Sequence, residues 1–177
     1  NHVQGVWNNV ATNYDTEFSD AIQFSLVTHW FSTCSTCDPW SNSTNSGTFL
    51  DSFTNWGQAG NFGAVSYDMG QVWTDRTFQS SVIGVAWING LCSSNSKYEA
   101  VSDFSTNAAF MRVLVAHETG HLFNCSHDAS GSNTIMAPAV NSTNTWSVAS
   151  ISSVNAKIAS SAATCFSSCG SAGPPVV

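Results

Sequence analysis

Three histidines and a glutamate stand close together in the stretch VAHETGHLFNCSHD, residues 115–128. His117, His121 and His127 follow the spacing HExxHxxxxxH, and Glu118 comes directly after the first of them. On a helix, His117 and His121 lie one turn apart, with about 6 Å between their side chains, so neutral imidazoles there can reach one zinc ion. A carboxylate at Glu118 can take a proton from a water polarised by the metal and later pass it to a leaving amine. The pattern therefore predicts one catalytic Zn²⁺ and hydrolytic chemistry.

The third histidine requires a sharp turn of the chain. In a continuing helix, His127 would lie about 9 Å beyond His121 along the axis and could not share the ion. Residues 123–126 must therefore turn back, and Asn124 occupies the position where this pattern usually has glycine. Glycine is favoured there because it enters the left-handed region without a Cβ penalty, and asparagine is the next most tolerant residue. Asn124 therefore fits the turn and supports the site.

The composition of the chain limits what the protein can be. The 177 residues are 42% hydrophobic and 12% aromatic, which is enough for one packed globular domain. Four basic against eleven acidic residues, a net charge of −7, argue against nucleic acid or an anionic membrane surface as partner. No apolar run approaches the roughly 20 residues of a membrane span, so no membrane insertion is expected. The chain begins at Asn1 without Met or a signal-peptide pattern, and we interpret it as a processed product.

Cysteines and sequons favour a secreted protein. Six cysteines, an even number, permit three disulfides, which form in oxidising, extracellular settings. Three N-x-Ser/Thr sequons also occur, at Asn42, Asn124 and Asn141. We expect a glycan at Asn42 rather than at Asn124, which the turn places between two metal ligands. A second, structural zinc site on Cys34, Cys37, Cys165 and Cys169 is the alternative to disulfides and is not favoured.

The elements that position the site follow from periodicity. Ser105 or Thr106 can cap a helix through residues 108–123, whose apolar residues face inward. Further helices are expected at residues 3–22 and 48–56, and a last one after the cap Ser147. Strands are expected at residues 23–30, 69–74, 82–88 and 98–102. Helices and strands are thus mixed along one domain.

These residues resemble a known family. HETGHLFNCSHD is similar to the zinc motif of metzincin metallopeptidases, and specifically of the adamalysin (reprolysin) branch that includes ADAM and ADAMTS catalytic domains. In that branch an aspartate follows the third histidine, as Asp128 does here, and asparagine at the turn is found in the ADAMTS group. NTIMAP resembles the Met-turn, which would place Met136 beneath the zinc. IGVAWINGLC, residues 83–92, resembles the family's edge strand with its following cysteine.

The resemblance covers most of residues 3–165 and implies a fold and an activity. The fold would be α/β (α+β) and metzincin-like, with a twisted mixed β-sheet, a long active-site helix and a small C-terminal subdomain ending in a helix. One catalytic domain would span residues 1–177, with an upper part to about residue 127 and a lower part over residues 128–177. The activity would be that of a secreted zinc endopeptidase on protein or peptide substrates, with Glu118 as general base and then acid, after removal of a propeptide.

The same resemblance implies further site residues. The edge strand would hold an extended substrate by β-pairing, at Val85, Ala86 and Trp87. Residues 137–146 would wall the specificity pocket, and the candidates to line it are Pro138, Ala139 and Val140. The family's disulfide pattern pairs Cys92 with Cys165 or Cys169 and Cys125 with the other of these two. Cys34 and Cys37 would then close a small loop.

The chain departs from the family at its start. The family sheet opens with a strand before the first helix, whereas this chain begins almost at that helix. Either the strand is lost or an upstream piece is missing. Asp68 in YDMGQVW resembles a position that can join a calcium site, but the acidic partner would lie on the absent segment. Ca²⁺ is therefore not expected, and a loop-capping role for Asp68 is preferred.

Two other functions remain open. The first is a metalloprotease-fold binding module or toxin with little proteolysis, which the presence of every catalytic residue does not support. The second is a zinc hydrolase of another fold, such as a thermolysin-like enzyme with a glutamate as third ligand. His127 and Met136 argue against it, and no glutamate follows Glu118 in the sequence.

Overall fold

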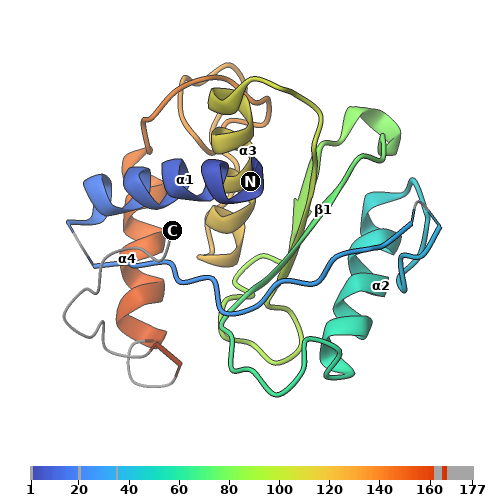
Figure 1. Ribbon diagram of the computed structural model, residues 1–177. Coiled ribbons are helices and arrows are strands. Elements are labelled where there is room, and N and C mark those ends of the chain that lie inside the picture. The colour runs from blue at the N-terminus through green and yellow to red at the C-terminus, as the bar shows by residue number, and fades with distance from the viewer. Residues whose placement is uncertain (1, 20, 35, 162–164, 167–177) are drawn as a thin grey trace.

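Helices enclose a small mixed β-sheet in the computed structural model (Figure 1). The structure describes residues 2–19, 21–34, 36–161 and 165–166. In chain order the elements are α1 (His2–Phe18), α2 (Ser46–Gln58), β1 (Gly70–Thr74), the short 3-10 helix η1 (Gln79–Ser81), β2 (Gly84–Ala86), β3 (Tyr98–Ser102), α3 (Ala108–Leu122) and α4 (Val148–Ser161). The mixed α+β class expected from the sequence is confirmed.

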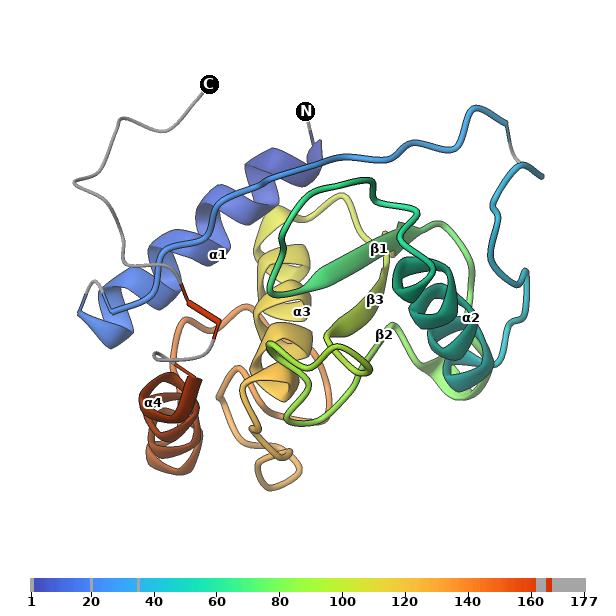
Figure 2. The ribbon, with the colours of Figure 1, turned by 90° about the horizontal axis from the view of Figure 1, so that it is seen from below.

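The sheet has the order β1-β3-β2, so β3 is central and β2 is an edge strand. β1 runs parallel to β3, with Gly70 opposite Tyr98, and β2 runs antiparallel to it, with Gly84 opposite Val101. All five residues of β3 are buried, as expected for a strand covered on both faces. Figure 2 shows α3 on one side of the sheet and α2 on the other, with α1 lying across the far side of α3.

The site helix α3 is surrounded by other elements. Its residues from Met111 to Leu122 are all buried, so it is enclosed on every side rather than being amphipathic. α1 covers it because Val6, Val10, Tyr14 and Phe18 form one buried face. The hydroxyl of Tyr14, near the end of α1, donates to the Ala116 carbonyl over 3.1 Å, which joins the two helices.

The strand expected at residues 23–30 is wrong. This segment runs without regular structure, since no neighbouring strand of the described chain pairs with it. Phe24 packs on Trp7 and Tyr14, and Trp30 packs on Trp40 and on Trp56 of α2. Between these contacts, Leu26 and Val27 are 55% and 51% exposed. The alternating pattern that indicated a strand therefore arises from the aromatic contacts of Phe24 and Trp30, and it does not mark a buried face.

Helix boundaries differ from the expectation in smaller ways. α1 ends at Phe18, and Ser19 has a φ of 52°. The cap of α3 is Asn107, whose side-chain oxygen accepts from the Ala109 N–H over 3.0 Å, so the choice of Ser105 or Thr106 was wrong. Asparagine is an equally good cap by physical chemistry. Ser147 does cap α4, accepting from the Ser150 N–H over 3.1 Å.

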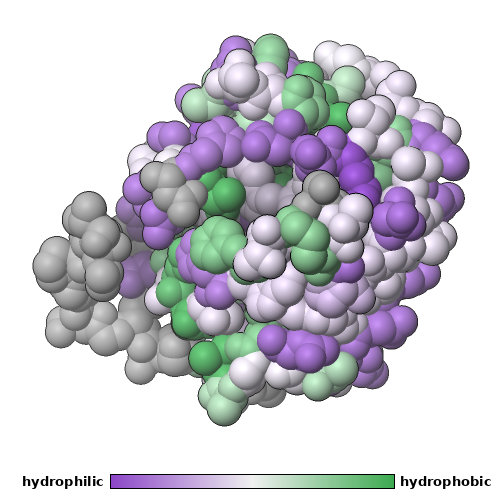
Figure 3. Space-filling view, turned by 45° about the vertical axis from the view of Figure 1, so that its right-hand side comes forward, coloured by the Kyte–Doolittle hydropathy of each residue, from purple (hydrophilic) through white to green (hydrophobic). Residues whose placement is uncertain are grey.

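The surface is polar but weakly charged. Only 8% of the residues are Asp, Glu, Lys or Arg, so Ser, Thr and Asn supply much of the outer layer. On the face seen in Figure 3, hydrophobic residues stand in separate patches among hydrophilic and neutral ones. In the described part of the chain, no helix has the length and apolarity to cross a membrane.

A buried carboxyl group joins β3, β1 and α3. Glu99 is fully buried, and its Oε1 accepts from the Gln71 side-chain amide and, over 3.1 Å, from the Thr119 hydroxyl. The Gln71 oxygen in turn accepts from the indole N–H groups of Trp7 and Trp73. Burial raises the pKa of Glu99 to about 8, so the folded protein holds a proton there in neutral solution.

This raised pKa predicts how stability depends on pH. The unfolded chain loses the Glu99 proton near pH 4.5, whereas the folded chain keeps it up to about pH 8. The proton therefore favours folding less and less as pH rises through this window, and stability falls. Glu99→Gln removes the titration but keeps an acceptor for Gln71 and Thr119. Relative to wild type, this variant should gain on the order of 2–4 kcal/mol in unfolding free energy between pH 5 and pH 8.

Urea unfolding of the metal-free proteins at several pH values measures this gain. Wild type and variant share every other titrating group, so their difference reports Glu99 together with its effect on the pKa of Glu118. Parallel stability curves for the two proteins would show that Glu99 is ionised in the fold.

Candidate metal centre

The three histidines of the motif converge on one point. The Nε2 atom of His127 lies 3.1 Å from that of His117 and 3.2 Å from that of His121. The ligand atoms of all three lie within 4.8 Å of one another. α3 supplies His117 and His121, and the loop after the helix supplies His127. Three imidazole nitrogens this close, facing one another, form a candidate metal centre.

The helix end brings His127 back to the other two. The Asn124 N–H donates to the His121 carbonyl over 2.9 Å, and the Cys125 N–H donates to the Gly120 carbonyl over 2.9 Å. These two bonds are those of a Schellman motif, which needs a left-handed residue just after the helix. Asn124 has a φ of 73° and takes that position. The turn reverses the chain so that His127 reaches the cluster.

Backbone carbonyls fix the orientation of two imidazoles. The Nδ1 of His117 lies 2.8 Å from the Ile135 carbonyl oxygen, and the Nδ1 of His121 lies 2.8 Å from that of Cys125. Because a carbonyl only accepts, each Nδ1 carries the proton and each Nε2 presents a lone pair to the cluster. Burial lowers the pKa of His117 to about 4 and also lowers that of His121, which favours the neutral rings. Neutral, pre-oriented nitrogen donors fit a zinc ion.

Met136 packs against α3 because Gly120 leaves room for it. Met136 is fully buried and follows Ile135, whose carbonyl holds His117. A Cβ at Gly120 would lie 2.6 Å from the sulfur of Met136 and 3.3 Å from the Trp146 ring. The glycine between His117 and His121 therefore lets the methionine pack directly against α3.

Asp128 joins the histidine loop to the elements below it. Its Oδ1 accepts from the Ser147 hydroxyl over 2.7 Å, and its Oδ2 accepts from the Thr134 hydroxyl over 2.6 Å. Its backbone N–H donates to the Met136 carbonyl over 2.8 Å. Since Ser147 caps α4, one carboxylate connects the third histidine, the methionine turn and the last helix.

Glu118 occupies a dry position between α3 and the edge strand. It is only 4% exposed, and its Oε2 has no hydrogen-bond partner among the described residues. Burial, and secondarily the charge of Glu99, raises the pKa of Glu118 well above its ordinary value. Its carboxyl group lies against Gly84 of β2. A carboxyl group held in this way can carry a proton near neutral pH.

The residues expected to bind substrate lie on the edge strand and in the loop before α4. Val85 and Ala86 belong to the edge strand β2, whereas Trp87 follows it and donates from its indole N–H to the Thr54 hydroxyl over 3.0 Å. Pro138 and Ala139 are exposed, and Val140 packs against the core. The next part of that loop is held by Arg112 of α3, which donates to the carbonyls of residues 142 and 143 over 3.3 and 2.9 Å.

The structure joins Cys34 to Cys37 and Cys92 to Cys165. Cys125 is fully buried, and its sulfur lies 3.6 Å from the Ser150 carbonyl oxygen. Cys169, the partner expected for Cys125, lies outside the described residues. Asp68 lies near the second disulfide, and its carbonyl accepts from the Cys92 N–H over 3.1 Å.

The three sequons differ in their surroundings. Asn42 and Asn124 are both exposed, so access to the side chain does not separate them as expected from the sequence. The side-chain amide of Asn141 is engaged, donating to the Thr134 carbonyl over 3.1 Å.

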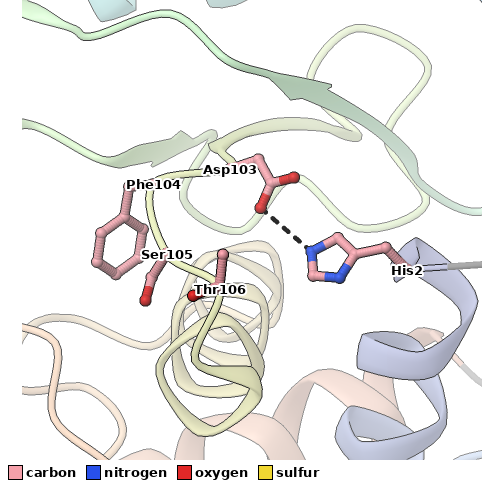
Figure 4. A pocket seen from close by; sticks show the side chains of 5 residues that line it. All are labelled: His2, Asp103, Phe104, Ser105 and Thr106. Atoms are coloured by element: carbon pink, nitrogen blue, oxygen red, sulfur yellow. Dashed lines mark hydrogen bonds and ion pairs between the residues drawn. The ribbon is translucent and has the colours of Figure 1, made fainter.

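A hollow at the other end of α3 is separate from the histidine cluster. Figure 4 shows its lining, which comes from the start of α1 and from the loop before α3: His2, Asp103, Phe104, Ser105 and Thr106. Its volume is about 380 Å³, and His2 Nε2 lies 3.1 Å from Asp103 Oδ1 across it. None of the three converging histidines lines it.

A mixed sheet, an enclosed helix and three converging imidazoles are the arrangement that the metzincin resemblance implied. The family described as Metallo-peptidase family M12B Reprolysin-like matches residues 1–128, and the chain belongs to that family.

Relatives by sequence are metalloproteinases by name. The chain is 32% identical over 97 residues to the snake venom metalloproteinase TM-1 of Protobothrops mucrosquamatus, covering 52% of this chain and 48% of the relative. It is 30% identical over 94 residues to the snake venom metalloproteinase atroxlysin-1 of Bothrops atrox, covering 50% and 46%. It is 41% identical over 64 residues to the mouse disintegrin and metalloproteinase domain-containing protein 19, covering 36% and 7%. The matched regions are thus less than half of each relative.

Several positioning groups escaped the sequence analysis. They are the carbonyls of Ile135 and Cys125 and the side-chain-free positions Gly84 and Gly120. Backbone carbonyls leave no trace in a sequence. A glycine inside a helix or strand pattern is a signal, since it often marks a close approach.

The turn at Asn124 predicts the behaviour of two variants. Asn124→Gly should keep zinc affinity nearly unchanged, because glycine adopts positive φ without strain. Asn124→Val should cost on the order of 1–3 kcal/mol of binding free energy, because a β-branched residue resists that conformation and displaces His127. Competition of each protein with a chromogenic chelator for zinc measures both values. An unchanged affinity in the valine variant would show that the turn does not depend on this residue.

Proposed function

We propose that the chain is the catalytic domain of a secreted zinc endopeptidase. The observation that carries this proposal is the convergence of the Nε2 atoms of His117, His121 and His127, with the Nδ1 atoms of the first two held by carbonyls. Glu118, in the same turn of α3 as His117, supplies the carboxyl group that such a centre needs. The family of the chain and the names of its relatives support the same conclusion.

In this proposal each residue has one task. The three imidazoles would hold the zinc ion, which when bound polarises the scissile carbonyl and makes water a better nucleophile. Glu118 accepts a proton from the water while the oxygen of that water attacks the carbonyl carbon. The same proton then passes from Glu118 to the amine nitrogen as the C–N bond breaks. The raised pKa of Glu118 suits the second step, because the group must hold the proton until the C–N bond breaks, whereas the first step uses its ionised form.

The substrate would lie along β2. This strand pairs with β3 on one side only, so its other edge can pair with an extended peptide at Val85 and Ala86. The loop over residues 137–146 would wall the pocket for one substrate side chain, with Pro138, Ala139 and Val140 lining it. Arg112 supports this wall by holding two of its carbonyls.

Secretion is part of the proposal. The two disulfides of the described residues suit an oxidising compartment, and two relatives are venom proteins by name. A removed propeptide stays an expectation from the family resemblance.

The competing function is a binding module with the same fold. A module without catalysis does not need a carboxyl group in a dry position, where burial costs stability. Glu118 is nevertheless buried beside the histidines without a partner for its Oε2 in the described chain. This favours the enzyme.

Glu118→Gln tests the proposal. The amide keeps the shape of the side chain and leaves all three imidazoles in place but cannot accept the proton. The variant should retain about one zinc per chain, while its peptidase activity falls at least about 100-fold. Metal content is measured by atomic spectroscopy, and activity by digestion of an unfolded protein followed by mass spectrometry of the cut sites.

Chelation supplies the control. Treatment of wild type with a chelator should abolish cleavage, and added zinc should restore it. A glutamine variant with full activity would remove Glu118 from the mechanism. A wild type that binds zinc but cleaves no peptide bond would support the binding module instead.

A further inference from the structure

Gly84 of the edge strand lies directly against the carboxyl group of Glu118. A Cβ built at Gly84 would lie 2.6 Å from Cδ and 2.8 Å from Cγ of Glu118, with Oε1 nearer still. Real Cβ atoms do not approach other atoms so closely, so any side chain at position 84 would have to displace the carboxyl group. The absence of a side chain here is therefore what gives Glu118 its place.

Backbone conformation does not explain the glycine. Gly84 is not among the glycines with positive φ, and it sits in a regular ladder opposite Val101. Another residue could adopt this backbone without strain. Space is the remaining reason for glycine, and the atoms that occupy the space belong to Glu118.

Glu118 has little else to fix its carboxyl group. The neighbouring side chains in α3 are held by hydrogen bonds, His117 to the Ile135 carbonyl and Thr119 to Glu99. Within the described chain the Glu118 carboxyl group has no hydrogen bond of this kind, and its Oε2 is buried without a partner. Its position is therefore set by packing, and Gly84 forms part of the wall.

We propose that Gly84 is a positioning residue for Glu118. Because position 84 of β2 has no side chain, the catalytic carboxyl group packs directly against the strand backbone there. This inference rests on the proposed peptidase function. It makes one strand responsible for two tasks, since β2 would both pair with the substrate backbone and set the position of the base. The base would thereby keep a fixed relation to the peptide that it acts on.

An alanine at position 84 should disturb the position of Glu118 without disturbing the fold. The atoms that an alanine would meet are the far end of a flexible side chain, which can rotate away. At Gly90, in contrast, a Cβ would meet the Ser96 backbone, with its carbonyl carbon at 2.8 Å, and the chain itself would have to move. Gly84→Ala should thus leave the fold intact and shift the carboxyl group.

The first experiment compares Gly84→Ala with wild type. The variant should keep about one zinc per chain, while kcat falls on the order of 10- to 100-fold with little change in KM, as for a misplaced catalytic group. Gly5→Ala is the matched control, because nothing lies within 4 Å of a Cβ at that exposed position. An unchanged kcat in Gly84→Ala would overturn the proposal, and so would loss of zinc together with activity, since the site would then be disturbed as a whole.

A second experiment does not use activity or metal. Thermal unfolding of the metal-free protein is measured for Gly84→Ala, for Glu118→Ala and for the double variant. With the glutamate side chain removed, the alanine at position 84 has no carboxyl group to displace. Its effect on Tm should therefore be more favourable in the Glu118→Ala background than in wild type, by an amount that reports the contact.

Equal effects of Gly84→Ala on Tm in the two backgrounds would show that a side chain at position 84 does not contact Glu118. That result would overturn the proposal. Failure of the proposed function is distinguishable, because a wild type without peptidase activity leaves this stability comparison intact. A non-zero coupling together with a reduced kcat would establish Gly84 as a positioning residue for Glu118.

Discussion

The hydrogen bond between His117 Nδ1 and the Ile135 carbonyl is the contact on which the rest of the site depends. It fixes the tautomer of His117, and it ties α3 to a turn 18 residues further along the chain. That turn is itself anchored, since the Ile135 N–H donates to the Thr145 carbonyl and the Met136 carbonyl accepts from Asp128. Two histidines on one helix would leave the third histidine and its loop free to move. Here the segment after α3 is hydrogen-bonded to the helix and to itself, so these residues are held in place.

Burying α3 on all sides makes this precision possible, but it also buries polar groups, which costs stability where they lack partners. An enclosed helix cannot reorient, so its two histidines keep their separation. The polar groups that it carries inward must find partners, and Thr119 and the Ala116 carbonyl find theirs in Glu99 and Tyr14. Arg112 is partly satisfied by loop carbonyls. Glu118 is the member of this set that packing alone holds, which is typical of a group retained for function rather than for folding.

Features encoded within one turn of chain could be predicted from the sequence. The histidine spacing and the tolerance of asparagine for a left-handed turn are local, and the fold class follows from helices and strands whose existence is strongly patterned. The pairing of β-strands is not local, because a strand also needs a neighbouring strand. Residues 23–30 alternate like a strand without having one in the described chain. Their alternation comes from Phe24 and Trp30, which contact aromatic rings elsewhere. The cap is Asn107 rather than Ser105 or Thr106. Residue type alone could not select among these three, because all of them are suitable caps.

Two glycines, Gly120 within α3 and Gly84 on β2, make room for groups of the site that are held in different ways. Gly120 leaves room for Met136 and Trp146 against α3, whose two histidines are held by carbonyl hydrogen bonds. Gly84 leaves room for the carboxyl group of Glu118, which has no such bonds among the described residues. Metal ligands gain from rigid hydrogen bonds, because each bond fixes a lone pair. A proton carrier that was bonded as firmly could not exchange its proton between water and amine. Its position must instead come from packing, and the missing side chain at Gly84 of β2 leaves the space for it.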